Sequence, residues 1–147
     1  MCIRDSLNRL VKVPTDFGNA LEKIPKKIRR MYIHAYQSYV FNSLLEYYIK
    51  NNLELPENFP LIGYNSELTG KIKEIVENIL EKDELTLESF RLKRTPTLSE
   101  EGQHRNTFFK ADNIKILKIS DNYLKMSFVL PKGCYATSAL AVLGRVL

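Results

Sequence analysis

Apolar residues recur at helical spacing through residues 24–50, a stretch with no glycine and a single proline. That proline, Pro25, lies where a helix tolerates it, because the first backbone N–H groups of a helix have no partner. The pattern predicts one long helix ending near residues 50–52, where two asparagines can form a left-handed cap. Two apolar stripes are expected to face the core. They comprise Ile24, Ile28, Met31, Ala35, Leu45 and Ile49, and then Tyr32, Tyr36, Tyr39, Val40, Leu44, Tyr47 and Tyr48.

A third stripe on the same helix is polar. Lys27, Arg30, His34, Gln37 and Phe41 follow one another at steps of three or four residues, so they share one face. We expect His34 to be a hydrogen-bonded structural residue. Gln37, Ser38 and Asn42 lie among aromatic residues, where burial is expected. Because buried amides need partners, these side chains are predicted to brace a neighbouring loop.

The segments around this helix are short. Asp16 is expected to cap a small helix before it, and residues 53–66, with two prolines and Gly63, indicate a loop. Leu61–Tyr64 could form a strand within that loop. A helix is predicted from Thr69, followed by a shorter one from Thr86 that Pro96 would end.

Beyond residue 100 the apolar period changes to two, which is typical of strands. The pattern predicts a strand over residues 105–111 and a hairpin over residues 113–130, with one face buried and its turn at Ser120–Asn122. Asp121 and Asn122 tolerate positive φ in such a turn. Poor alternation in the first hairpin strand indicates a bulge. Residues 131–133 then break the strand, and a helix capped by Thr137 follows. The fold class is therefore α+β.

Composition restricts the function only loosely. The chain has 147 residues, 44% of them apolar, and a formal charge of +5 that favours polyanions. Cys2 and Cys134 are far apart, so neither a disulfide framework nor a zinc site is expected. Because no apolar run is long enough to span a bilayer, we expect a soluble, cytoplasmic protein without a membrane partner.

Two basic features are candidates for binding phosphate. The first is the start of the long helix, with Lys26, Lys27, Arg29 and Arg30, which could equally be a solvated helix face. The second is Lys132, which precedes Gly133 and the start of the last helix. Free N–H groups at a helix start favour anions, but an exposed lysine in a tight connection would look the same.

Two sequence strings carry a family resemblance. IPKKIRR followed by HAYQSYVFN (His34–Asn42) resembles a signature of the TruD family of tRNA pseudouridine synthases, and FVLPKGCYATSAL (Phe128–Leu140) is similar to the family pattern F-x-L-P-x-G-[SC]-[YF]-A-T. The order of the two strings also matches. The resemblance covers roughly residues 20–140 and is closest to the archaeal and eukaryotic-like branch.

The resemblance implies that the chain is a C-terminal fragment of an isomerase that converts a tRNA uridine, typically uridine-13, to pseudouridine without cofactor or metal. Residues 7–50 and 101–147 would belong to the catalytic domain, and residues 51–100 to a short, mostly helical insertion region. No oligomeric state is implied. The expected RNA-binding residues are Lys26, Lys27, Arg29, Arg30, His34, Arg105 and Lys132. Residues expected to support the pocket are Gln37, Ser38, Phe41, Asn42, Gly133, Tyr135 and Thr137.

The chain also departs from the family pattern. The family places its catalytic aspartate in a G-x-K-D-x-x-A-x-T-x-Q motif, which is absent here, so no catalytic residue is nominated and the chain alone is expected to be inactive. Residues 1–6 are interpreted as a non-native segment, and residues 141–147 as a possible second one. The hairpin is expected to pack beside the long helix. The alternatives are a non-catalytic tRNA- or RNA-binding module, or a helical protein whose tyrosine-rich stripe binds a partner.

Overall fold

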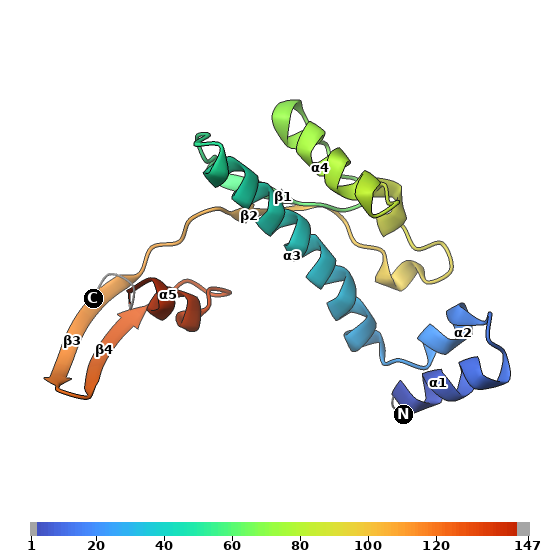
Figure 1. Ribbon diagram of the computed structural model, residues 1–147, viewed down its shortest axis with the longest axis horizontal. Helices are drawn as coiled ribbons and strands as arrows, with labels where there is room; N and C mark the ends of the chain where they lie inside the picture. Colours follow the sequence, from blue (N-terminus) through green and yellow to red (C-terminus); the bar gives the residue numbers. More distant parts are fainter. Residues whose placement is uncertain (1–2, 144–147) are drawn as a thin grey trace. The chain divides into compact units, whose positions relative to one another are not determined.

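A computed structural model of the chain describes residues 3–143, which fall into two compact units divided between Arg105 and Asn106 (Figure 1). The first unit is mainly helical, and the second contains a hairpin and one helix. In the first unit the elements are α1 (Ile3–Lys12), α2 (Phe17–Glu22), α3 (Lys26–Lys50), β1 (Asn58–Leu61), α4 (Gly70–Lys82), the 3-10 turns η1 (Leu87–Phe90) and η2 (Pro96–Leu98), and β2 (Gln103–Asn106). The second unit has β3 (Asp112–Ser120), β4 (Tyr123–Val129) and α5 (Ala136–Leu143). The α+β fold class is confirmed.

The helix α3 organises the first unit (Figure 1). It begins directly after Pro25 and ends at Lys50, as predicted. Asn52 follows with a φ of 51°, and the Leu53 N–H bonds the Tyr48 carbonyl at 2.9 Å, which satisfies an orphan carbonyl at the helix end. Thr69 and Thr86 precede α4 and η1 as expected, and Thr86 forms a reciprocal capping box with Ser89.

One side of α3 forms the hydrophobic core with β1, α4 and η1. Leu44, Phe59, Ile62 and Val76 are fully buried, and Phe59 packs edge-on against Tyr48 with ring centroids 5.0 Å apart. Burying one such side chain contributes roughly 1.5–3 kcal/mol. The members of this core are Val40, Phe41, Leu44, Tyr48, Phe59, Ile62, Ile75, Val76, Leu80 and Phe90.

The predicted burial of the first apolar stripe is wrong for three of its members. Met31 and Ile49 are 57% and 61% exposed, and Ala35 is also exposed. Tyr32 and Tyr39 of the second stripe are both 53% exposed. Apolar residues occur almost all around α3, so periodicity alone could not select the face that meets β1 and α4. Those neighbours selected a face that includes Gln37, Val40, Phe41, Leu44 and Tyr48.

A close backbone contact joins the loop after β1 to the segment before β2. A Cβ at Gly63 would lie 2.2 Å from the Gly102 nitrogen, so only glycine allows the two backbones to come this near. The Tyr64 N–H donates to the Glu100 carbonyl at 3.1 Å, and the Glu100 N–H donates to the Phe90 carbonyl at 3.2 Å. β1 and β2 pair in a two-stranded sheet. Backbone hydrogen bonds from both its N–H and its carbonyl group therefore hold Glu100 in place.

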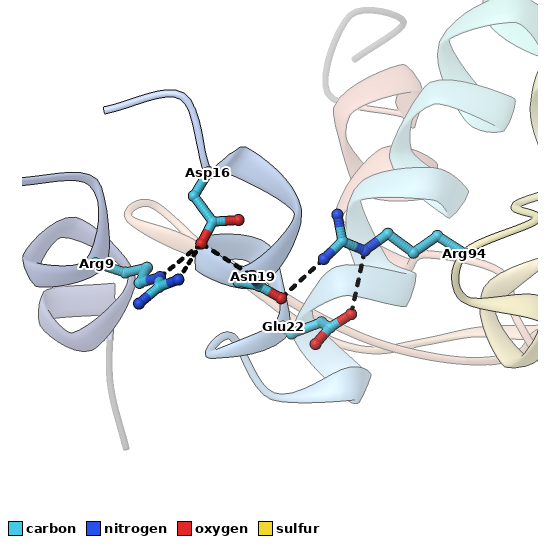
Figure 2. Close-up of polar contacts among 5 residues, drawn as sticks. All are labelled: Arg9, Asp16, Asn19, Glu22 and Arg94. Atoms are coloured by element: carbon cyan, nitrogen blue, oxygen red, sulfur yellow. Dashed lines mark hydrogen bonds and ion pairs between the residues drawn. The ribbon is translucent and has the colours of Figure 1, made fainter. Parts of the chain in front are cut away.

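Polar contacts attach α1 and α2 to the rest of the first unit (Figure 2). Asp16 precedes α2, as predicted, but its side chain accepts hydrogen bonds from the side chains of Arg9 at 2.6 Å and Asn19 at 2.9 Å rather than capping the helix. Arg94 donates to Asn19 at 2.8 Å and lies 3.6 Å from Glu22. The interpretation of residues 1–6 as non-native stays a prediction, although α1 begins at Ile3.

The hairpin of the second unit forms where the sequence places it. β3 and β4 are antiparallel, with Ser120 opposite Tyr123, and their register shifts between Asp112 and Lys115, and again between Ile116 and Lys118. These shifts confirm the bulge, and Asn113 adopts a φ of 52° at the first of them. None of the described side chains of residues 106–141 is buried, so the second unit by itself supplies no covering surface for the hairpin face that was predicted to be buried.

Several local predictions need correction. The turn at Asp121 and Asn122 forms without positive φ, which occurs among the described non-glycine residues at Asn52, Glu84 and Asn113. β1 lies three residues earlier than expected, and β2 stops at Asn106 instead of reaching residue 111. Pro96 begins η2 rather than ending a helix, in keeping with its fixed φ. No described helix has both the length and the hydropathy to cross a membrane.

Candidate functional site

The polar face of α3 forms one wall of a hollow of about 260 Å³, and residues 100–105 form the opposite wall. Five of the residues predicted from the sequence meet here, although Arg105 is far from the others in the chain. The hollow is lined by Arg30, His34, Gln37, Ser38, Leu61, Glu100, Glu101, Gln103 and Arg105. This is the largest gathering of predicted site residues in the described part of the chain, and all of it lies within the first unit.

Glu100 is the electrostatic centre of the hollow. Its side chain is only 9% exposed, and Oε1 accepts a hydrogen bond from Arg30 Nε at 2.6 Å. A second contact joins Arg30 Nη2 to Glu100 Oε2 at 3.4 Å, and His34 Nε2 lies 3.2 Å from Oε1. The prediction that His34 has a structural partner is therefore confirmed. Glu100 thus neutralises the charge of Arg30, and the predicted contact of Arg30 with RNA stays a prediction.

The pKa of Glu100 shows which of two opposing effects prevails. Burial acts to raise the pKa of this carboxyl group, because the charged form loses hydration. The hydrogen bond from Arg30 and the charges of His34 and Arg30 outweigh burial and hold the pKa below its ordinary value. Glu100 is therefore an ionised anchor that orders two α3 side chains, and its oxygens are already occupied by them.

Gln37 joins the floor of the hollow to the loop after β1. Its side chain is buried, and Nε2 donates to the Ile62 carbonyl at 2.7 Å. This bond satisfies a carbonyl at a fully buried residue and confirms that Gln37 braces a loop. Ser38 is half-buried beside it. Asn42 is exposed, so its predicted burial is wrong, because the helix turns that position away from the core.

Arg105 closes the other end of the hollow. Its guanidinium lies 5.3 Å from the centre of the Phe41 ring, within the range of a cation–π contact. Phe41 itself is 5% exposed and belongs to the core. A planar cation held on a rigid aromatic ring keeps its N–H donors available, and Arg105 forms no ion pair with any described residue.

The remaining predicted residues lie outside this hollow. Lys26 and Lys27 are exposed in the first turn of α3, and Arg29 lines a different hollow. Lys132, Gly133, Tyr135 and Thr137 belong to the second unit. Gly133 has a φ of 92°, which confirms its role in the sharp turn before α5. Thr137 lies inside the first turn of α5, which begins at Ala136, so it does not precede the helix as a cap would.

Besides the apolar Leu61, sequence reasoning missed three polar residues of the hollow, Glu100, Glu101 and Gln103. They lie within two residues of Gly102, in a segment from which only Arg105 was predicted as a site residue. A run of two glutamates beside a glycine looks like an exposed loop, and Glu101 is exposed, with its carboxylate accepting from the Tyr64 hydroxyl at 2.8 Å. Glu100 could not be found from its neighbours in sequence, because its partner Arg30 is 70 residues away in the chain.

The hollow can hold a polar, flat group, but its described residues offer no evident nucleophile. It presents amide, hydroxyl and guanidinium groups at fixed positions, which suit positioning by hydrogen bonds. Among the described residues of the whole chain, no cluster of three or more His, Cys, Asp or Glu side chains could hold a metal ion.

The fold defines the class of protein first. A crystal structure from Methanosarcina mazei, assigned as a tRNA pseudouridine synthase D (TruD), superposes on 93% of this chain and 43% of its own with a TM-score of 0.72. The sequences are 24% identical, so this likeness establishes the fold. The chain therefore has the fold of part of that crystal structure.

The sequence comparison then identifies the family. The family model described as tRNA pseudouridine synthase D (TruD) matches residues 2–59 and 54–142, and the chain belongs to this family. The relatives named "Probable tRNA pseudouridine synthase D" from Methanopyrus kandleri and Nanoarchaeum equitans are 34% and 35% identical to it. The matches cover 93% and 85% of this chain, but only 38% and 36% of those relatives. The chain therefore spans well under half the length of these curated proteins.

Proposed function

We propose that this chain is part of an RNA-modifying isomerase that converts a uridine of tRNA to pseudouridine. The observation that carries the proposal is the family match, which extends over residues 2–59 and 54–142 and includes both strings found in the sequence. The relatives that share this match are named for that activity. Within the family, the modified uridine is expected to be uridine-13 of tRNA, and the activity is expected in the cytoplasm.

The reaction is redox-neutral, and its bond changes balance without an oxidant, a reductant or a transferred group from another molecule. The bond between N1 of uracil and C1′ of ribose breaks, the base turns, and a bond forms between C5 and C1′. The proton on C5 is released, and N1 takes up a proton. The uridine must leave its stack to reach a protein group, so residues that hold the turned-out nucleotide are as necessary as the nucleophile.

The hollow on α3 suits such a holding role. Arg105 presents donors to a phosphate or a base edge, while Glu100 fixes Arg30 and His34 and thereby keeps the α3 wall rigid. A wall held by charge-assisted hydrogen bonds positions substrate groups more accurately than a mobile surface. We expect the catalytic aspartate to come from outside the 147 residues, and the chain alone to be inactive.

A tRNA release assay tests this function. The reading frame is first extended upstream and downstream in the source DNA. The protein that it encodes should release tritium from tRNA containing [5-³H]uridine, and pseudouridine should map to position 13. The 147-residue chain should release none. Failure of an extended frame that contains the aspartate motif to release tritium would reject the enzyme assignment. Mapping to another position would reject only uridine-13.

A non-catalytic RNA-binding module is the second candidate. The unpaired side chains of Lys26 and Lys27 favour it, because neither contacts a carboxylate among the described residues. If the source DNA places true start and stop codons at the present ends, and the chain binds tRNA with a steep salt dependence but no turnover, this second function is the better account.

A further inference from the structure

A second hollow lies on a different side of α3 and shares no lining residue with the first. It has a volume of about 460 Å³, within the range of roughly 300–1,000 Å³ typical of small-molecule sites. Its walls come from α2, α3 and the segment between η1 and η2. A neighbouring hollow of about 250 Å³ has Tyr32, Ile33 and Leu92 in common with it. We call the two together the Tyr32 groove.

The floor of the Tyr32 groove is apolar and includes an exposed aromatic ring. Tyr32 is 53% exposed and lines both hollows, with Ile33 and Leu92 beside it. A tyrosine that a folded protein leaves half uncovered between two hollows can stack on a flat group from either hollow. Nucleobases have such flat faces, and stacking of one base on an aromatic side chain is worth about 1–3 kcal/mol.

The rim of the groove is basic. Arg29, Arg91, Lys93 and Arg94 line it, against one carboxylate, Glu22. Arg94 is held by Asn19 and Glu22 (Figure 2), and Arg91 by Glu88 at 3.1 Å. The side chains of Arg29 and Lys93 have no ion pair or hydrogen bond with any described residue, and Arg29 Nε is buried without a partner. Two uncompensated cations therefore border an apolar floor.

We propose that the Tyr32 groove binds an unpaired nucleotide of RNA, with its base stacked on Tyr32 and its phosphate between Arg29 and Lys93. Charge favours this occupant, because a phosphate would neutralise Arg29 and Lys93, the two cations of the rim that have no carboxylate partner among the described residues. A recess with an apolar floor accepts a single base and excludes a base-paired helix. The choice of RNA among polyanions rests on the proposed function.

Stacking is tested by binding of the 147-residue chain to a fluorescent single-stranded oligouridylate, measured by anisotropy. Tyr32→Ala should weaken binding roughly 5- to 150-fold, as loss of one stacked base predicts. Tyr32→Phe keeps the ring and should bind like the original. Tyr39→Ala is the matched control, since Tyr39 is also 53% exposed on α3 but does not line the groove.

The phosphate contact has a separate readout in the salt dependence. Lys93→Gln should lower the slope of log K against log salt by about 0.7, the value for one phosphate on a single strand. Lys73→Gln is the control, because Lys73 faces Glu77 at 3.8 Å on α4 and is not a groove residue. Equal slopes for the two variants would remove the phosphate contact from the proposal.

The remaining outcomes separate this inference from the proposed function. Equal losses for Tyr32→Ala and Tyr39→Ala, no binding of the oligouridylate, or preference for duplex RNA would each overturn the groove assignment. In the extended reading frame, 4-thiouridine-labelled tRNA should cross-link at Tyr32 or at residues 92–94. Absence of that cross-link in an active enzyme would overturn the groove assignment and leave the isomerase function standing. Cross-linking without tritium release would reject the isomerase function alone.

Discussion

The two units of this chain contain similar apolar residues but use them differently. In the first unit, aromatic and aliphatic side chains from α3, β1, α4 and η1 close around a shared core. In the second, Ile114, Ile116, Leu117 and Ile119 of β3 are each more than half exposed. All nine residues of β3 are exposed, although the strand has the composition of a buried one.

The difference shows that an apolar pattern predicts which side chains favour burial, but does not show which other part of the protein covers them. A helix such as α3 meets several elements that the chain itself provides. A two-stranded hairpin has two faces and two edges, and it is marginally stable alone. The predicted packing of the hairpin beside α3 would provide one covering surface, and it stays a prediction.

Matched truncations in the two units should give the largest difference. Leu44→Ala removes a fully buried side chain and should cost about 2–5 kcal/mol in free energy of unfolding. Leu117→Ala makes the same change at a side chain that is 56% exposed and should cost less than about 0.5 kcal/mol. Urea unfolding measures both. A large loss for Leu117→Ala would mean that the hairpin face is covered in solution.

Hydrogen exchange should show the same contrast without a substitution. Amides in the middle of α3, near Val40 and Leu44, lie over the core and should exchange at least about a hundredfold more slowly than hydrogen-bonded amides of β3 and β4. Mass spectrometry of peptides from the two units measures the ratio. Equal protection would contradict the description of an unsupported hairpin.

The ion pair between Glu100 and Arg30 in the α3 hollow should contribute to the free energy of unfolding in a pH-dependent way. Glu100→Gln should cost about 1–2 kcal/mol at pH 7, because it weakens a charge-assisted bond to a half-exposed Arg30. The folded state lowers the pKa of Glu100, so this contribution is full above the ordinary pKa, about 4.3, and is lost as pH falls through the folded value. The urea midpoints of Glu100→Gln and of the original chain, measured at several pH values, should therefore converge in acid. A constant difference would show that charge is not the cause.

Two glycines offer the smallest and most local comparison. Gly63→Ala places a Cβ against the backbone of residues 101–102 and should cost about 1–3 kcal/mol by overpacking. At Gly18 the nearest atoms belong to the mobile end of Arg94, 1.9 Å from the added Cβ, so that side chain can move. Gly18→Ala should leave the urea midpoint nearly unchanged and speed exchange only in residues 3–22. A large decrease in the urea midpoint for Gly18→Ala would mean that the Arg94 side chain cannot move away from the added Cβ.

The sequence by itself determined the local elements and the family. Pro25 and the asparagines after Lys50 bounded α3, Thr69 and Thr86 preceded their helices, and Gly133 marked the turn before α5, because caps and turns depend on neighbouring residues. Two ordered strings were enough to indicate the TruD family, which the family match confirms. The third stripe also correctly placed Arg30, His34 and Gln37 on one face.

Only the tertiary structure decided which face of α3 is buried and which charges are free. Met31 is exposed and Gln37 is buried, the reverse of what their hydropathy predicts, because β1 and α4 approach the side of α3 that carries the Gln37 amide. Arg30 and Arg29 are adjacent in sequence, yet one is neutralised by Glu100 and the other borders the Tyr32 groove. Such differences depend on partners up to 70 residues away, and periodicity along one helix contains no information about them.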